Sequence, residues 1–227
     1  MKTIGILGGM GPEATILLMQ KVFDAVPNAR DDADHIPMIV YQNPQVPSRI
    51  KALIEGTGED PAPVLAHMAQ DLEKAGVSAL AMPCNTAHHY APVIEAASSQ
   101  PFLNMLDLTA DHLAECGAER IGMLASPATR LTGVFDAPFS ERGLSQLTLP
   151  DDDELLQVIR AVKAGKPAEE TGPELSRLAQ VLLDQGADHL LVACTELSLL
   201  TSYLPSSSAW TDSLDCLASA IVSFARS

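Results

Sequence analysis

The stretch AQDLEKAGVSALAMPC at 69–84 returns 110 residues later as AQVLLDQGADHLLVAC at 179–194. In both copies a helix-forming segment ends at a glycine, and an apolar run typical of a buried strand follows it. Each apolar run ends at a cysteine, Cys84 in the first copy and Cys194 in the second. The recurrence of helix, glycine, strand and cysteine in one order predicts that the chain contains the same α/β unit twice.

The alternation of strands and helices extends outward from both copies. The run RIGMLA at 120–125 resembles TIGILG at 3–8, so the second half starts as the first does. Alternating strands and helices are typical of a parallel sheet with crossover helices. We expect strands over 3–7, 36–41, 77–82, 101–106, 120–125 and 209–212, and helices over 13–26, 61–75 and 214–225.

This pattern predicts an α/β fold of two similar domains, each a parallel sheet flanked by helices, related by an approximate twofold. We place the first domain at 1–104 plus 208–227 and the second at 105–207, with the C-terminal helix returning to the first. Ligands of open α/β sheets bind beyond the carboxyl ends of the strands. Cys84 and Cys194 stand at such ends, so we expect the active site in a cleft between the domains.

Composition narrows the class of protein. The 227 residues are 47% hydrophobic, which is enough apolar mass for a core. A net charge of −15 with only 14 Lys and Arg argues against a nucleic-acid partner. No apolar run approaches the roughly 20 residues of a membrane span, and the short run at 3–7 is broken by glycines, unlike a signal peptide. We expect a cytoplasmic protein that acts on a small molecule.

The four cysteines fall into two pairs. They form no CxxC pair and no zinc-ligand pattern, so we expect free thiols and no metal site. Cys116 and Cys216 lie on expected helices among apolar neighbours, which predicts that both are buried in the core. Cys84 and Cys194 each precede a polar turn that leads into a helix, whose N-terminal dipole lowers a thiol pKa.

Four motifs resemble those of the aspartate/glutamate racemase family, in the family's order and over nearly the whole chain. They are GGMGPEAT at 8–15, NPQVPSR at 43–49, MPCNTAH at 82–88 and CTE at 194–196. The resemblance implies cofactor-independent racemisation of an acidic amino acid, aspartate or possibly glutamate. No lysine has a pyridoxal-phosphate context, so we expect no cofactor. The resemblance also implies a homodimer.

The resemblance implies Cys84 and Cys194 as two acid/base groups that flank the substrate α-carbon. One removes the α-proton and the other returns a proton to the opposite face, which suits a thiol because its pKa in an unstructured peptide is about 8.5. Near-attack contact of each sulfur with the α-carbon would set the sulfurs about 7 Å apart. Some relatives carry threonine at the first position and prefer one enantiomer, whereas this chain should act on both.

Polar and cationic residues would hold the substrate. The resemblance implies that threonine and asparagine side chains bind the α-carboxylate and amino group, and that Arg49 and Lys163 bind the acidic side chain. A dianionic substrate of a protein with net charge −15 needs such local positive charge, although Arg160 and Lys166 compete with Lys163 for that role. The expected substrate-binding residues are Met10, Gln42, Arg49, Asn85, Thr86, Thr129, Lys163, Thr195 and Glu196.

Three positions leave alternatives open. Glu196 could bind the substrate ammonium or accept backbone N–H bonds at a helix start. His88 lies just past the first cysteine and could cap a helix or have another structural role. Pro127 stands near Thr129 where the family has a flexible pair, and it should stiffen that loop.

Three rival functions remain. The first is a dinucleotide-binding protein, because Gly9-x-Gly11-x-x-Ala14 fits the glycine pattern of that class. The class also needs an acidic residue at the end of the second strand, where this chain has the uncharged sequence YQN at 41–43. A hydantoin racemase, maleate isomerase or decarboxylase of the same superfamily would share the cysteines but lack the 43–49 motif and Lys163. A small-molecule-binding protein without turnover is disfavoured because both thiols are intact.

Overall fold

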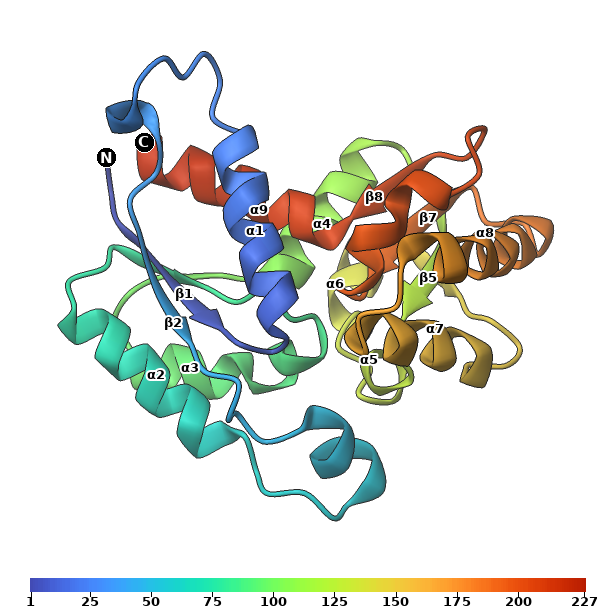
Figure 1. Cartoon of the computed structure of the whole chain (residues 1–227), viewed down its shortest axis with the longest axis horizontal. Coiled ribbons are helices and arrows are strands. Elements are labelled where there is room, and N and C mark those ends of the chain that lie inside the picture. Colours follow the sequence, from blue (N-terminus) through green and yellow to red (C-terminus); the bar gives the residue numbers. More distant parts are fainter. The chain divides into compact units, whose positions relative to one another are not determined.

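The computed structural model describes all 227 residues, which divide into two compact units. The first unit comprises Met1–Leu108 and Leu214–Ser227, and the second comprises Thr109–Ser213. The expected boundaries, after residues 104 and 207, lie a few residues earlier. Each unit contains one four-stranded parallel sheet, in the order β2-β1-β3-β4 or β6-β5-β7-β8. The predicted α/β fold with two parallel sheets flanked by helices is therefore confirmed (Figure 1).

The first unit follows the expected order of strands and helices. Pro12 begins the first helix, where its missing N–H leaves no bond unmade. The elements are β1 (Ile4–Gly8), α1 (Pro12–Asp24), β2 (Met38–Gln42), α2 (Ala62–Lys74), β3 (Ala79–Ala81), α3 (Ala91–Ala97), β4 (Phe102–Leu103), the start of α4 (Met105–Glu115) and α9 (Ser213–Arg226). Short non-α helices span Asp32–Asp34, Lys51–Glu55 and Thr86–Tyr90.

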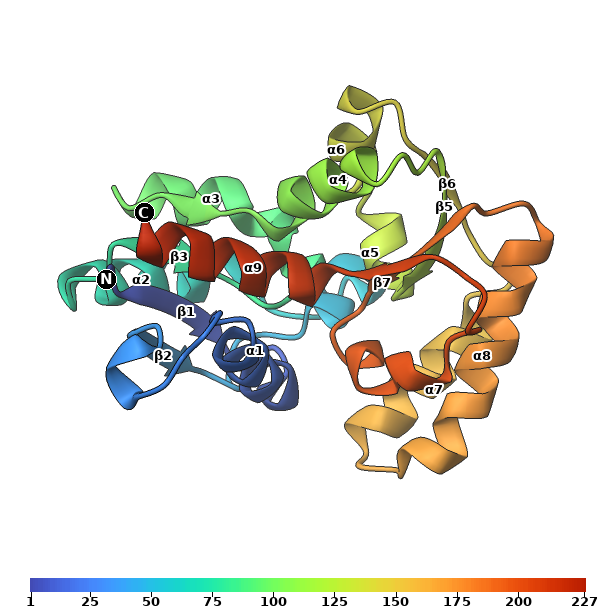
Figure 2. The same cartoon turned by 90° about the horizontal axis from the view of Figure 1, so that it is seen from above.

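Helices cover both faces of the first sheet because side chains alternate along its central strand. Ile4 and Ile6 pack with buried residues of α1 and α9, whereas Leu7 packs with α2 and α3. The C-terminal helix α9 thus returns to the first unit, as expected, and Figures 1 and 2 show it beside α1. The Lys2 amide donates to the Ala225 carbonyl (2.9 Å), which ties the two ends of this unit together.

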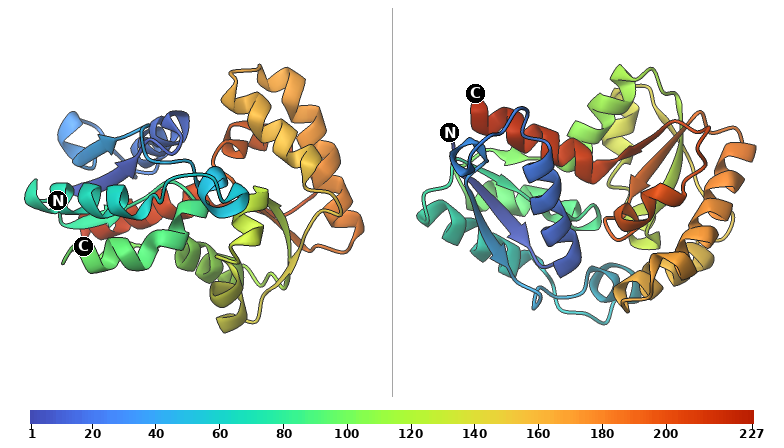
Figure 3. Two further views of the ribbon diagram at one scale, coloured as in Figure 1. Left: turned by 90° about the horizontal axis from the view of Figure 1, so that it is seen from below. Right: turned by 45° about the horizontal axis from the view of Figure 1, so that its top comes forward.

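The second unit repeats this arrangement. Helices α7 and α8 lie side by side on one face of the sheet, and α5 and α6 lie on the other (Figures 2 and 3). None of the helices in the structure combines the length and apolarity needed to cross a bilayer. The elements are β5 (Arg120–Ala125), α5 (Pro127–Leu131), α6 (Asp136–Glu141), β6 (Ser145–Leu147), α7 (Asp153–Lys163), α8 (Ala168–Asp184), β7 (His189–Ala193), a 3-10 helix (Leu197–Tyr203) and β8 (Trp210–Asp212).

One side-chain contact recurs in both sheets. Gly5 on β1 pairs with Leu80 on β3, and a Cβ at Gly5 would lie 3.1 Å from the leucine side chain. Gly122 on β5 pairs with Leu190 on β7, and a Cβ there would lie 2.9 Å from that leucine. Each central strand therefore leaves room for a leucine of the next strand. The two leucines are the pair matched in the sequence repeat, so the contact supports duplication.

Gly9, directly after β1, lies where another segment of backbone needs space. Its φ of +96° is one that residues with a Cβ rarely adopt, and an added Cβ would lie 2.3 Å from the Asn43 carbonyl carbon. The Asn43 amide donates to the Gly8 carbonyl (3.2 Å), so the ends of β1 and β2 are joined there. The space beside this glycine is thus filled by the chain itself, which weighs against the dinucleotide-binding interpretation.

A Gly9→Ala substitution should therefore lower the free energy of unfolding by more than about 3 kcal/mol, because it combines backbone strain with a clash against main chain. Gly76→Ala is a matched control: its φ is +85°, but nothing lies within 4 Å of the added Cβ. Strain alone should cost that variant about 1–2 kcal/mol. Urea unfolding measures both, and equal losses would show that the approach of Asn43 is unimportant.

Candidate active site

Cys84 lies in a tight turn beyond the carboxyl end of β3. Its amide donates to the Met82 carbonyl (2.9 Å), and the 3-10 helix Thr86–Tyr90 begins two residues later. The cysteine is 8% exposed and packs in an apolar cluster that includes Met10. Asn85 beside it is buried and Thr86 is half-buried. The turn thus presents a nearly buried thiol with polar neighbours at the strand end.

His88 joins this turn to a second segment of the first unit. Its Nδ1 lies 2.8 Å from the Cys84 carbonyl oxygen, and the Met105 amide donates to its Nε2 (3.1 Å). Because an amide can only donate, Nε2 carries the lone pair and Nδ1 carries the hydrogen. Met105 is the first residue of α4, so His88 caps that helix and holds the Cys84 carbonyl at the same time. The helix-capping alternative for His88 is confirmed.

The surroundings keep His88 neutral. The side chain is buried, and its ring packs against Phe102 with the centroids 5.4 Å apart. Burial lowers the pKa of His88 to about 4, and the bond to the Cys84 carbonyl only partly offsets this effect. At neutral pH the imidazole is therefore uncharged, in the single tautomer that the two backbone groups require.

Cys194 occupies the corresponding place in the second unit, directly after β7, and it is also 8% exposed. Its thiol donates to Glu196 Oε2 (3.0 Å), and the other carboxylate oxygen lies 3.1 Å from Lys163 Nζ. Lys163 is the last residue of α7, so a strand end and a helix end supply this row of three groups. The structure thus brings together three of the residues expected at the site.

The lowered pKa that was expected for Cys194 from the following helix N-terminus is wrong, because the pKa of this thiol is raised well above its ordinary value. Burial is the largest cause, and the negative charge of Glu196 and its hydrogen bond with the thiol act in the same direction. The charge of Lys163 and the backbone amide of Glu196 oppose the shift. Cys194 is therefore a protonated thiol at neutral pH in this arrangement.

Glu196 does not have one of the roles considered for it. It stands at the start of the 3-10 helix Leu197–Tyr203, but its side chain makes no capping hydrogen bond there. The alternative in which it accepts backbone N–H bonds at the helix start is wrong, because the carboxylate contacts the thiol and Lys163 instead.

Arg49 lies in the proline-rich turn after β2. Its Nη1 donates to the carbonyls of Val46 (3.3 Å) and Pro47 (2.9 Å), and the residue is half-buried. These bonds orient the guanidinium with one nitrogen and leave the other side of the fork for a further acceptor.

Thr129 is buried beside a helix cap. The Ser126 hydroxyl caps α5 by accepting a hydrogen bond from the Thr129 amide (3.2 Å), and the hydroxyls of Ser126 and Thr129 lie 3.0 Å apart. Pro127 is the first residue of α5, where proline fits well, so it starts a helix rather than stiffening a loop. Of the remaining expected residues, Thr195 is buried and Gln42 is the exposed last residue of β2.

All four cysteines are free thiols, but Cys116 is not in the core. It follows the last residue of α4 and is exposed, with its sulfur 3.6 Å from His112 Nε2. The prediction that it is buried is wrong, because its amide continues the helical bonding to the His112 carbonyl (3.0 Å) and it lies on the same exposed face as that histidine. Cys216 on α9 is partly buried.

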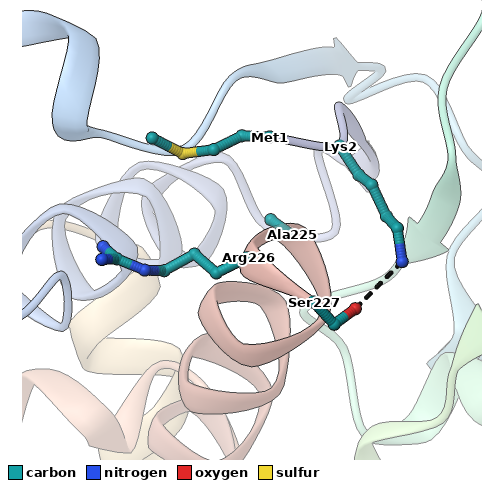
Figure 4. A pocket seen from close by; sticks show the side chains of 5 residues that line it. All are labelled: Met1, Lys2, Ala225, Arg226 and Ser227. Atoms are coloured by element: carbon teal, nitrogen blue, oxygen red, sulfur yellow. Dashed lines mark hydrogen bonds between the residues drawn. The ribbon is translucent and has the colours of Figure 1, made fainter.

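A surface hollow lies away from the expected residues of the first unit. It is lined by Met1, Lys2, Ala225, Arg226 and Ser227, where the Lys2 ammonium donates to the Ser227 hydroxyl (Figure 4). None of the expected site residues lines it. No group of three or more His, Cys, Asp or Glu side chains is placed to hold a metal ion.

The low pKa of His88 should make stability pH-dependent. The unfolded protein takes up a proton at this residue below pH 6.5, whereas the folded protein does so only near pH 4. Stability is thus full above pH 6.5 and falls as the pH approaches 4, by about 3 kcal/mol from this group. Urea unfolding of wild type and His88→Asn from pH 7 to 4 tests this. The difference in the free energy of unfolding between the two proteins should narrow as the pH falls, and a difference that stays constant would contradict the prediction.

The pKa and the alkylation rate of the Cys194 thiol should change in opposite directions when Glu196 or Lys163 is replaced by glutamine. Glu196→Gln removes the negative charge, so the thiol pKa should fall and alkylation at pH 8 should accelerate about tenfold. Lys163→Gln removes the opposing positive charge, so alkylation should slow. Peptide mass spectrometry after iodoacetamide treatment measures Cys194 separately, and exposed Cys116 in the same sample serves as the internal control. Changes in one direction for both variants would contradict this electrostatic account.

Comparisons with known proteins find relatives over nearly the whole chain. The model of the family described as Asp/Glu/Hydantoin racemase matches residues 7–221. An aspartate racemase structure from Picrophilus torridus is 30% identical, with a TM-score of 0.86 over 100% of this chain and 95% of that one. The broad specificity amino-acid racemase RacX of Bacillus subtilis is 29% identical over 97% of this chain and 96% of its own length.

A glutamate racemase structure from Bacillus anthracis, isoform RacE1, shares the fold alone, at 15% identity and a TM-score of 0.70 over 99% of this chain and 80% of that one. The family model and the Picrophilus structure both span nearly the whole chain, including both cysteine turns. The chain therefore belongs to the Asp/Glu/Hydantoin racemase family and is a racemase.

Proposed function

We propose that this racemase interconverts the enantiomers of an acidic amino acid, with aspartate as the first candidate, and that it needs no cofactor. The observation that carries the proposal is the matched position of Cys84 and Cys194, each nearly buried beyond the carboxyl end of a strand next to the central strand of its sheet. The likeness to an aspartate racemase at 30% identity over the whole chain favours aspartate. We also propose that the enzyme acts in the cytoplasm, and that it works as a homodimer, as the family resemblance implies.

In this proposal each unit supplies one acid/base thiol. The Cys84 thiolate takes the α-proton from one face, the electron pair stays on the α-carbon and its carboxylate, and the Cys194 thiol gives its proton to the other face. The protonated state of Cys194 in the resting enzyme suits it to act as the acid in this direction. For the opposite enantiomer the roles exchange. Each turnover leaves the two protonation states exchanged, so the thiols must re-equilibrate before the next substrate of the same hand.

Arg49 and Lys163 would bind the substrate carboxylates. Arg49 is held by two carbonyls through one nitrogen, and its fork offers further donors for a carboxylate. The ammonium of Lys163 has three donors, so it can keep its contact with Glu196 while it binds a substrate oxygen. Asn85, Thr86, Thr129 and Thr195 would hold the α-amino and α-carboxylate groups, with Met10 and Gln42 at the margin of the site.

A broader substrate range is the second candidate. It is favoured by the likeness to a broad specificity amino-acid racemase over nearly the whole chain. The ion pair of Lys163 with Glu196 points the same way, because a cation already neutralised by the protein attracts a second carboxylate less strongly. Hydantoin racemisation, which the family description also covers, is a further outcome that the same assay resolves.

Proton exchange in deuterated water tests the proposal. Wild type should racemise L- and D-aspartate and place deuterium on the α-carbon of the product, because the proton returned comes from an exchanged thiol. Cys84→Ser and Cys194→Ser should each lose at least about 1,000-fold in kcat, since a hydroxyl is a far weaker acid than a thiol. Chiral chromatography measures racemisation, and mass spectrometry measures the deuterium.

Controls and rival substrates complete that experiment. Cys216→Ser on α9 is the matched control and should keep wild-type activity. Glutamate, alanine, lysine and a 5-substituted hydantoin are run beside aspartate. Faster turnover of neutral or basic amino acids would establish the broader range, and the absence of racemisation and α-deuterium with every amino acid would overturn the proposal.

A further inference from the structure

The groups around His88 limit what it can do for the reaction. Both ring nitrogens are used by backbone groups, Nδ1 by the Cys84 carbonyl and Nε2 by the Met105 amide. Neither nitrogen is left to exchange a proton with the Cys84 sulfur. The ring is buried and packed against Phe102, so a different orientation would need a new cavity.

The two bonds join segments that are separate in the chain. Cys84 follows β3, whereas Met105 starts α4 just after β4, the neighbouring strand. The start of α4 is itself fixed, because the Asn104 side chain accepts the Leu106 amide (3.0 Å) and Met105 is fully buried. His88 thus anchors the Cys84 carbonyl to a rigid helix end. It can do so because a neutral imidazole has one donor and one acceptor nitrogen in the same plane.

We propose that His88 is a positioning residue, which holds the Cys84 turn against the first turn of α4 in one neutral tautomer and so sets the direction of the thiol. This inference rests on the proposed function for its kinetic consequences, but its structural part concerns Cys84 alone. Displacement of a reacting group by about 1 Å can cost 100-fold in rate. The loss should therefore be in kcat rather than in KM, because His88 has no polar group left to bind substrate.

Two near-isosteric variants separate the two bonds. In His88→Asn the amide nitrogen replaces Nδ1 as donor to the Cys84 carbonyl. In His88→Gln the amide oxygen can replace Nε2 as acceptor for the Met105 amide, but no donor faces Cys84. We expect His88→Asn and His88→Gln, which each keep one of the two bonds, to lose less in kcat than His88→Leu, which keeps neither and should lose about 100-fold at an unchanged KM.

Alkylation of Cys84 gives a readout that does not depend on racemase activity. In a Cys116→Ser, Cys216→Ser background, iodoacetamide should modify Cys84 about tenfold faster in His88→Gln than in wild type, because the released turn exposes a thiol that is otherwise 8% exposed. Cys194 in the same sample should react at its wild-type rate. His89→Asn, at the exposed neighbouring histidine, is the matched control and should change neither rate nor kcat.

The outcomes are separable. If His88→Asn is folded by circular dichroism and as inactive as His88→Leu, or if Cys84 alkylation slows in every variant, the histidine acts as an acid or base and the proposal is overturned. Wild-type kcat and alkylation in all three variants would overturn it as well. If His88→Leu does not fold, His88→Asn and His88→Gln decide the matter. Failure of wild type to racemise any amino acid would sink the proposed function, and the alkylation rates would still decide the anchoring of Cys84.

Discussion

In both units a leucine side chain packs over a glycine of the neighbouring strand, and this contact fixes the register of the two strands at the centre of the sheet. Leu80 lies over Gly5 in one sheet, and Leu190 lies over Gly122 in the other. A side chain on either glycine would push the strands apart or shift their pairing, and a shift of one residue would turn every side chain to the opposite face. With the register held in this way, a cysteine stands four residues after each leucine, beyond the end of β3 in one sheet and directly after β7 in the other.

The two cysteine turns share a backbone position but differ in their electrostatics. Around Cys84 the partners are neutral: an imidazole kept uncharged by burial and two backbone groups. Around Cys194 the partners are charged, because Glu196 accepts a hydrogen bond from the thiol and Lys163 forms an ion pair with Glu196. The two matched turns thus differ in the charge of the groups beside them. In the proposed two-base reaction one thiol is protonated while the other is not, and the raised pKa of Cys194 suits it to be the protonated one.

The sequence was a sound guide wherever short-range rules govern the chain. Most strands and helices fall where periodicity, Pro12 and the glycines indicate them, and the two sheets have the expected parallel topology. The strand expected at 101–106 is wrong in its second half, because β4 covers only Phe102–Leu103 and Met105 already begins α4. It was a poor guide to side-chain environment. Cys116 was expected in the core because its neighbours are apolar, but it lies on the same exposed face as His112, four residues earlier. Pro127 was expected to stiffen a loop, but it begins α5 under the Ser126 cap.

By itself, the sequence determined the α/β class, the repeat of a helix–glycine–strand–cysteine unit and the four motifs that mark the racemase family, because all of these depend on residue order and local propensity. Only the tertiary structure decided what each functional group touches. That His88 binds Cys84 and the start of α4 at once, and that Glu196 lies between Cys194 and Lys163, follow from packing of segments that are 17 and 33 residues apart in the chain. Hydrogen-bond partners and desolvation act through space, and no spacing in the sequence encodes them.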